Sequence, residues 1–308
     1  MEDAALPRKE GVVAGSGGTR FWVGASTSGG LGSPASGIRP LDVASDGTAV
    51  IGDPVDVGAN PMFLAWRDAH TLAVAHELDD GLVSTWTVEG DRLTPLGSAS
   101  GTGAKVAPCH VAFAPSGELV FAANYGGGRL SLHAVAPTAA LVTAIDFAGT
   151  GPHPERQDAP HPHQAVVDHA RARLLVPDLG ADRLRVIPLD GLPGAFAHDG
   201  ADDLAVHPGA GPRHLVIAGD HAIVANELDR TVSIVDLAGG HEVAWFPADA
   251  TVLPRGLGLS AIRLTRDGVV LVGDRDADAL AALRFDPDAL TLAPVASVRT
   301  GGRHPRDL

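Results

Sequence analysis

The stretch GPRHLVI at residues 211–217 decides the fold, because versions of it recur along the chain. Clear copies are NPMFLAW at 60–66, APCHVAF at 107–113 and PHPHQAVV at 160–167; LSAIRLT at 259–265 is degenerate, and HPRDL at 304–308 begins a sixth. The anchors that align these copies are Met62, Cys109, His163, Arg213, Ser260 and Arg306, spaced by 47, 54, 50, 47 and 46 residues. A repeat of this length is typical of a β-propeller.

Each repeat has the strand pattern of one propeller blade. After the anchor strand comes a turn and then a second apolar strand, at 71–77, 119–125, 173–179, 222–228 and 269–275. A third, alternating strand follows at 82–88, 129–135, 183–189, 231–237 and 279–285, and a weaker fourth strand completes the unit. Four short strands separated by Gly, Asp, Asn and Pro predict an antiparallel meander, and no stretch has a sustained helical period. We therefore expect an all-β protein with almost no helix.

Composition sets limits on the class of protein. The chain has 308 residues, 45% of them hydrophobic, and contains no basic, apolar leader or 18-residue apolar run. We expect a flexible tail at residues 1–18 and a single propeller domain at 19–308. The single cysteine, Cys109, excludes an intrachain disulfide and favours a cytoplasmic location. A net charge of −14 argues against nucleic acid as a partner. We also expect no membrane association and a monomer.

A ligand site is predicted at one mouth of the propeller channel. In an up-and-down blade, the start of the first strand and the end of the second strand lie at the same mouth. The anchors His163, Arg213 and Arg306 should therefore lie near second-strand ends such as Glu227 and Arg275. Purely structural repeat positions should converge on similar residues, whereas these diverge into His, Arg and Glu. Their divergence is the indication of function.

One long insertion lies at that same mouth. Between Cys109 and His163 the chain contains GTGPHPERQDAPHPHQ, residues 149–164. Insertions on one face of a repeat array often mark the binding face. Its residues His153, His161 and His163 resemble a metal cluster, but the spacing lacks a matched carboxylate, so no metal and no cofactor are expected.

Several strings resemble the lactonase family of seven-bladed propellers, whose members include 6-phosphogluconolactonases. They are NYGGG at 124–128, HPERQDAPHPHQ at 153–164, VPDLGADRLRV at 176–186, PGAGPRHL at 208–215, NELDRTV at 226–232 and TGGRHPRDL at 300–308. The resemblance covers residues from about 20 to 308. It implies a propeller of the seven-bladed type and hydrolysis of a sugar-acid lactone, with 6-phosphogluconolactone as the expected small anionic substrate.

The resemblance also implies site residues. A related propeller that interconverts a muconate and its lactone has a histidine, an arginine, a glutamate and a further arginine at the positions of His163, Arg213, Glu227 and Arg275, which we take as the catalytic residues. Substrate-binding residues are predicted to be His110, Asn124, Tyr125, Arg156, His161, His214, Asn226 and Arg306.

The chain departs from the family pattern in two places. The turn at 218–222 is two residues shorter than is usual between PRHL and NEL, so that Arg213 and Glu227 are 14 positions apart. The family also continues past PRDL, whereas this sequence stops at Leu308, so the C-terminal blade is expected to be incomplete. The N-terminal strands around 20–26, 37–43 and 49–57 then correspond to the second, third and fourth strands of the last blade.

The residues themselves leave other interpretations open. Arg213 could tie neighbouring blades together, Glu227 could only neutralise Arg213, and the glycines after Tyr125 fit a tight turn. Cys109 suits a packed strand start better than a nucleophile.

Lactone hydrolysis needs a base for water and donors for the oxyanion. An ordinary histidine pKa suits His163 as the base, Glu227 could orient it or replace it, and Arg213 and Arg275 supply fixed positive donors. The absence of a serine-nucleophile motif predicts direct attack by water. A muconate-type cycloisomerase and a non-catalytic binding scaffold remain alternatives.

Overall fold

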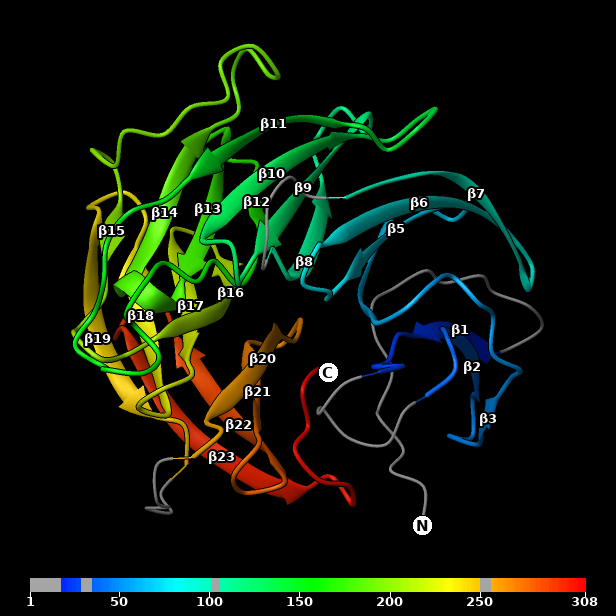
Figure 1. Ribbon diagram of the computed structural model, residues 1–308. Coiled ribbons are helices and arrows are strands. Elements are labelled where there is room, and N and C mark those ends of the chain that lie inside the picture. The colour runs from blue at the N-terminus through cyan, green and yellow to red at the C-terminus, as the bar shows by residue number, and fades with distance from the viewer. Residues whose placement is uncertain (1–17, 29–34, 101–105, 250–255) are drawn as a thin grey trace. The chain divides into compact units, whose positions relative to one another are not determined.

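The computed structural model describes residues 18–28, 35–100, 106–249 and 256–308 (Figure 1). The chain divides into two compact units, one spanning residues 5–146 and the other containing residues 147–308. Each unit is built from antiparallel sheets in which consecutive strands pair as neighbours. The two units are therefore described separately.

The described residues of the N-terminal unit form three sheets. The first has three strands, β1 (Gly18–Val23), β2 (Arg39–Ala44) and β3 (Ala49–Ile51). The second comprises β4 (Pro61–Asp68), β5 (Thr71–His76), β6 (Leu82–Glu89) and β7 (Arg92–Ser100). The third comprises β8 (Pro108–Phe113), β9 (Leu119–Asn124), β10 (Arg129–Ala134) and β11 (Leu141–Asp146). Apolar side chains of the second and third sheets form one shared cluster.

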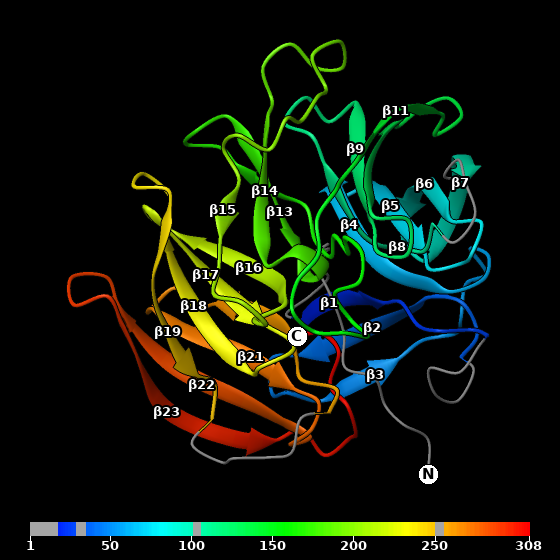
Figure 2. The same cartoon turned by 60° about the vertical axis from the view of Figure 1, so that its left-hand side comes forward.

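In the C-terminal unit, the residues that the structure describes form three four-stranded sheets, which Figure 2 shows from a second side. The first comprises β12 (Val166–Asp168), β13 (Arg173–Asp178), β14 (Arg183–Pro188) and β15 (Leu204–Ala205). The second comprises β16 (Pro212–Ala218), β17 (His221–Asn226), β18 (Thr231–Asp236) and β19 (His241–Pro247). The third comprises β20 (Leu259–Leu264), β21 (Val269–Asp274), β22 (Ala279–Asp286) and β23 (Thr291–Arg299).

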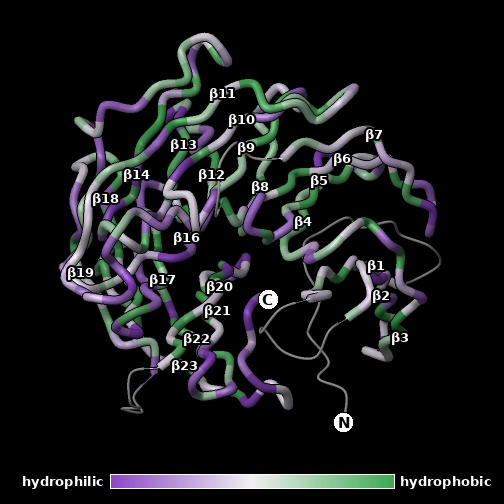
Figure 3. Tube along the Cα trace, viewed as in Figure 1, coloured by the Kyte–Doolittle hydropathy of each residue, from purple (hydrophilic) through white to green (hydrophobic). Residues whose placement is uncertain are grey.

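The apolar core of the C-terminal unit lies between successive sheets. Buried residues of the second sheet, such as Ile223 and Ile234, cluster with Ile262 and Val272 of the third sheet. A separate cluster joins the first sheet to the second through residues such as Leu184. Figure 3 shows the same pattern as hydrophobic strands interrupted by hydrophilic turns. Burial of alternate apolar side chains between sheets is the packing expected of propeller blades.

The predicted repeat has a constant local geometry. The residue before each anchor pairs with the last residue of the next strand, as in Pro108↔Asn124, Pro162↔Asp178, Pro212↔Asn226 and Leu259↔Asp274. In three of these pairings, in β8, β16 and β20, the ladder shifts register directly afterwards, so the anchor lies in a β-bulge. Bulges re-aim side chains and are frequent beside active sites.

The sequence predictions are confirmed in most elements and corrected in three. All ten predicted second and third strands form, and within the described ranges the only helix is the 3-10 turn η1 (Leu179–Ala181). The described residues make six sheets, not the seven of the expected family type. No strand is assigned to residues 301–308, although HPRDL resembled a strand start, and the first strand already begins at Gly18. Residues 1–17 of the predicted tail lie outside the described residues, and the single domain at 19–308 stays a prediction.

Candidate active site

Glu227 and Arg275 occupy equivalent positions at the ends of the second strands of their sheets. Glu227 directly follows β17 and Arg275 directly follows β21. Each backbone N–H donates to the carbonyl oxygen of a left-handed glycine just before the first strand of its own sheet: Glu227 to Gly211 (2.8 Å) and Arg275 to Gly258 (3.1 Å). Gly258 has a φ of +71°, and a Cβ there would lie 1.7 Å from the Glu227 carbonyl oxygen. Glycine is therefore required where these two blades approach.

Three guanidinium groups contact the carboxylate of Glu227. Oε1 is 2.5 Å from Nη2 of Arg156, whereas Oε2 is 2.9 Å from Nε of Arg213 and 2.9 Å from Nη2 of Arg275. Arg156 comes from the insertion, Arg213 from the bulge in β16 and Arg275 from the end of β21. We call these four residues the arginine–glutamate cluster. The shorter turn between Arg213 and Glu227 therefore leaves the pair in direct contact.

Three of the four side chains in the arginine–glutamate cluster are buried, and the cluster carries more positive than negative charge. The side chains of Glu227 and Arg213 are each 3% exposed, and that of Arg275 is 8% exposed. Burial alone would raise the pKa of Glu227, but Arg275, Arg213 and Arg156 together hold that pKa below its usual value. Glu227 is consequently ionised at neutral pH. Its single negative charge faces three guanidinium charges, which suits the set to an anionic ligand.

Backbone contacts orient Arg275 toward the cluster. Its Nε donates to the carbonyl oxygen of Gly258 at 3.3 Å, and its Nη2 donates to the carbonyl oxygens of Leu257 and of Leu259, the latter at 3.2 Å. These contacts fix the guanidinium plane along the start of β20. Arg275 therefore does not point to the outer rim or to the opposite end of the sheet, as the prediction of a shared site required.

His163 lies close to the same charges and is buried. It is 6% exposed, its N–H donates to the carbonyl oxygen of Pro177 at 2.9 Å, and its ring meets that of His214 edge-on at 5.3 Å between centroids. Burial, followed by the positive charges of Arg213, Arg306 and Arg275, lowers the pKa of His163 well below its usual value. The imidazole is therefore neutral at pH 7, and its titration lies below the neutral range assumed from sequence.

The C-terminal segment positions Arg306 beside these residues. The carbonyl oxygen of Pro305 accepts from Oγ of Ser260 at 2.6 Å, and Arg263 donates to the carboxylate of Asp307 at 2.8 Å. Both neighbours of Arg306 are thus tied to β20, and its charge acts on the pKa of His163. The segment supports the prediction that Arg306 belongs to the same region, although it forms no strand.

The other predicted contacts are distributed differently. The N–H of His161 donates to Asp178 at 2.7 Å, and its ring lies 3.7 Å from the Asp158 carboxylate. The amide nitrogen of Asn226 donates within its own sheet to Thr231 and Ser233. His110, Asn124 and Tyr125 belong to the N-terminal unit, where the Asn124 amide likewise donates within its sheet to Ser131. Their role in binding stays a prediction.

Two polar residues beside the cluster were missed by the sequence reasoning. Gln157 is 1% exposed and Asp182 is 7% exposed. The sequence contains one signal for Asp182, because GAD at 180–182 is a turn where an aspartate can adopt a left-handed conformation and cap backbone N–H groups. Its φ is +50°. No comparable signal marks Gln157, which lies in the insertion.

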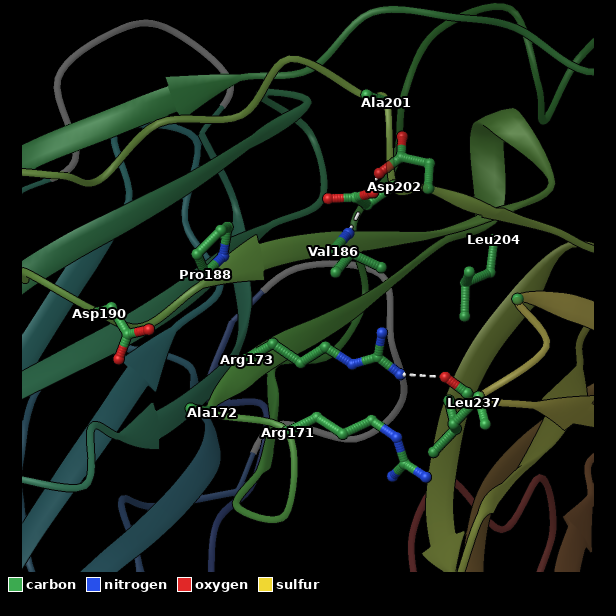
Figure 4. A pocket seen from close by; sticks show the side chains of 13 residues that line it. Arg171, Ala172, Arg173, Val186, Pro188, Asp190, Ala201, Asp202, Leu204 and Leu237 are labelled. Atoms are coloured by element: carbon green, nitrogen blue, oxygen red, sulfur yellow. Dashed lines mark hydrogen bonds between the residues drawn. The ribbon is translucent and has the colours of Figure 1, made fainter.

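A groove lined by both charged and apolar side chains lies at the end of the sheets opposite the arginine–glutamate cluster. It has a volume of about 520 Å³ and is lined by Arg171, Arg173, Leu204 and Leu237, among others. Figure 4 shows Arg171 and Arg173 extending side by side toward Leu237, whose carbonyl oxygen accepts from Arg173 at 2.9 Å. Leu237 follows Asp236, which pairs with the start of β17, so this groove is separate from Glu227.

No group of three or more His, Cys, Asp or Glu side chains among the described residues is arranged to hold a metal ion, and His153, His161 and His163 form none. Nor does any helix within the described ranges have the length and apolar character needed to cross a membrane. The cytoplasmic location and the monomeric state stay predictions.

Proteins similar to this chain are lactonases and their relatives. This chain is 31% identical over 265 residues to the 6-phosphogluconolactonase of Bacillus subtilis, and the match spans 80% of this chain and 73% of that protein. The 6-phosphogluconolactonase of Yersinia pestis is 29% identical over 268 residues, covering 83% of this chain and 75% of the relative.

Solved structures agree with the sequence relatives. The Pseudomonas aeruginosa periplasmic gluconolactonase has a TM-score of 0.81 at 25% identity, covering 92% of this chain and 84% of that chain. A Lactobacillus plantarum protein matches with a TM-score of 0.81 and 25% identity over 92% of this chain and 83% of that chain. The all-β propeller fold and the lactonase type of enzyme are thereby confirmed. Because the family model for "Lactonase, 7-bladed beta-propeller" matches residues 20–308, the chain belongs to that family.

Proposed function

We propose that this protein hydrolyses the lactone of an anionic sugar acid, with 6-phosphogluconolactone as the expected substrate. The observation that carries the proposal is the arginine–glutamate cluster, in which three guanidinium groups surround one buried carboxylate. Guanidinium groups match the geometry of phosphate and carboxylate oxygens. The names of the Bacillus and Yersinia relatives support the phosphorylated lactone, and the Pseudomonas neighbour supports a gluconolactone more generally.

We assign the oxyanion to Arg213 and Arg275. Attack of water on the lactone carbonyl places negative charge on the carbonyl oxygen, and donors already fixed in a buried site stabilise that charge. Arg213 and Arg275 are held by Glu227, and Arg275 is also held by the backbone at 257–259. The substrate phosphate is assigned to Arg156, whose side chain is 34% exposed, and to Arg306.

We assign His163 as the base and Glu227 as the residue that holds the arginines. Both oxygens of Glu227 contact guanidinium groups, which lowers its pKa and makes it a weak proton acceptor. His163 is neutral and able to accept a proton. Because nearby arginines contribute to its low pKa, an anionic substrate placed among them would offset their field and raise the basicity of His163.

In the proposed reaction, water attacks the lactone directly, and no covalent bond forms between the substrate and the protein. The water oxygen forms a bond to the carbonyl carbon while its proton passes to His163. The tetrahedral intermediate then breaks the bond between that carbon and the ring oxygen, and the ring oxygen takes the proton from the imidazolium. The products are a carboxylic acid, which ionises at neutral pH, and a hydroxyl group.

The test is the rate of 6-phosphogluconolactone opening above its spontaneous rate, measured beside unphosphorylated gluconolactone and a muconolactone. We expect Arg213→Ala to lower kcat by on the order of 10²-fold or more, the loss typical of one oxyanion donor. Arg284→Ala is the matched control, because Arg284 is 47% exposed and contacts Asp267 instead of the cluster. Turnover of the muconolactone alone would favour the cycloisomerase, and no turnover of any lactone by folded protein would leave the scaffold interpretation.

A further inference from the structure

The cluster depends on two segments that no strand ladder joins. Arg156 lies in the insertion that precedes β12, and Arg213 lies at the start of β16 in the following sheet. Both must reach the same carboxylate, at 2.5 Å and 2.9 Å from its oxygens. A fixed distance between the two segments therefore needs a connection outside the strands.

Asp182 provides such a connection. Its Oδ1 accepts from Nε2 of Gln157 at 2.7 Å and from the N–H of Gly211 at 2.8 Å, while Oδ2 accepts from the N–H of Gly209 at 2.7 Å. Gln157 is the residue next to Arg156, and Gly211 lies two residues before Arg213. One carboxylate thus bonds both segments close to the arginines that they carry.

The insertion is packed tightly where Asp182 holds it. The second bond of Gln157 Nε2 goes to the carbonyl oxygen of Leu179 at 2.8 Å, and its Oε1 accepts from the N–H of His153 at 3.0 Å. A Cβ at Gly180 would lie 1.8 Å from the carbonyl oxygen of Ala159, so the insertion lies directly against η1. Because both the nitrogen and the oxygen of the Gln157 amide form hydrogen bonds, a displacement of Asp182 would move Gln157 and the adjacent Arg156.

We propose that Asp182 is a positioning residue that sets the placement of Arg156 and Arg213 around Glu227. Asp182 is 7% exposed, and each of its three donors in the described structure is a neutral N–H group. A carboxylate makes stronger bonds to such donors than a neutral amide does. The inference rests on the proposed function for its kinetic consequence, but its geometric part concerns the chain alone.

The variant that tests this is Asp182→Asn. The amide is nearly isosteric but has only one acceptor oxygen, so its NH₂ group must face at least one of the N–H donors that the carboxylate accepts. We expect kcat for the lactone to fall by about 10- to 100-fold, the range in which small displacements of positioned groups act. The matched control is Asp168→Asn. Asp168 is 1% exposed at the far end of the same sheet, where it pairs with Arg171 and Arg173. That variant should lose stability and keep kcat.

A double-mutant cycle separates positioning from general destabilisation. If Asp182 acts through Arg156, then Arg156→Ala should cost less in the Asp182→Asn background than in the parent protein. Additive losses, or a folded Asp182→Asn protein with the parent kcat, would overturn the proposal.

A crystal structure of the full-length Asp182→Asn protein gives an answer independent of turnover. We expect the contact between Arg156 Nη2 and Glu227 Oε1 to lengthen or break, and an unchanged cluster would refute the positioning role. If the parent protein opens no lactone, the proposed function fails while this structural comparison still decides the role of Asp182.

Discussion

Replacing Glu227 by Gln should destabilise the protein strongly, because it removes the single negative charge that faces three guanidinium groups. Glutamine keeps the shape of the side chain but removes the negative charge that Arg213 and Arg275 contact at position 227. The side chains of Glu227, Arg213 and Arg275 are each at most 8% exposed. Breaking a buried ion pair by removing one partner costs about 3–5 kcal/mol, whereas a pair as exposed as that with Arg156 adds about 1 kcal/mol or less.

We expect the lower end of that range, about 3 kcal/mol, because the glutamine oxygen still accepts hydrogen bonds. For a chain of 308 residues, such a loss lowers the Tm by about 5 °C. The assay is thermal unfolding of the parent and of Glu227→Gln at pH 7. The matched control is Glu118→Gln, because Glu118 is exposed in a turn and the same change there should alter stability by about 0.5 kcal/mol or less.

The pH dependence gives the sign of the effect. The pKa of Glu227 is lower in the folded protein than its ordinary value of 4.5. Its contribution to stability is therefore complete above about pH 4.5 and is lost as the pH falls through the folded pKa. The Tm difference between parent and variant should be full at pH 7 and should shrink in acid. A Tm within about 1 °C of the parent at pH 7, or a difference that grows in acid, would refute the electrostatic account.

Three further outcomes are expected. His163→Ala should cut lactone turnover, and the parent pH profile of kcat/KM, which reports groups of the free protein, should show no His163 inflection near pH 6.5, because the pKa of His163 lies well below that value; an inflection at pH 6.5 that this variant abolishes would contradict the lowered pKa, and an unchanged rate would contradict the role of His163 as the base. Gly258→Ala should cost more than about 2 kcal/mol in unfolding free energy, since it adds both a strained φ and a clash with the Glu227 carbonyl oxygen; a Tm equal to the parent's would argue against that contact. Burial lowers the pKa of His207, but Asp229 and Glu242 together outweigh it and raise that pKa above 6.5. The contribution of His207 to the stability of the fold is therefore complete below about pH 6.5 and is lost as the pH rises through the folded pKa. His207→Gln should destabilise the protein more at pH 6 than at pH 9, as unfolding at both pH values would show.

The sequence was sufficient for the repeat and for the part of the site that follows the repeat. Arg213, Glu227 and Arg275 occupy fixed positions of the blade, namely the anchor and the end of the second strand, so their convergence could be predicted from spacing together with the family resemblance. The geometry confirms that Arg275 contacts Glu227, at 2.9 Å. Their catalytic roles stay a prediction.

The remaining features depend on contacts that no period encodes. Arg156 and Gln157 lie in an insertion without an equivalent in the other repeats, and Asp182 contacts loops that are distant in sequence. The burial of His163 was also missed, because an anchor position fixes the end of the sheet at which a residue lies but not how many side chains cover it. The lowered pKa of His163 follows from that burial and from the neighbouring arginines.

The pairing of Glu227 with Arg275 has a consequence for how this repeat array can evolve. The two residues occupy the same place in successive blades, yet they carry opposite charges and contact each other. Exchange or duplication of blades by recombination would put two glutamates or two arginines side by side, a repulsive junction that any new order of repeats would have to relieve. The opposite charges therefore favour the present order of these two blades. This part of the chain should resist rearrangement of its repeats more than a junction without charged residues would.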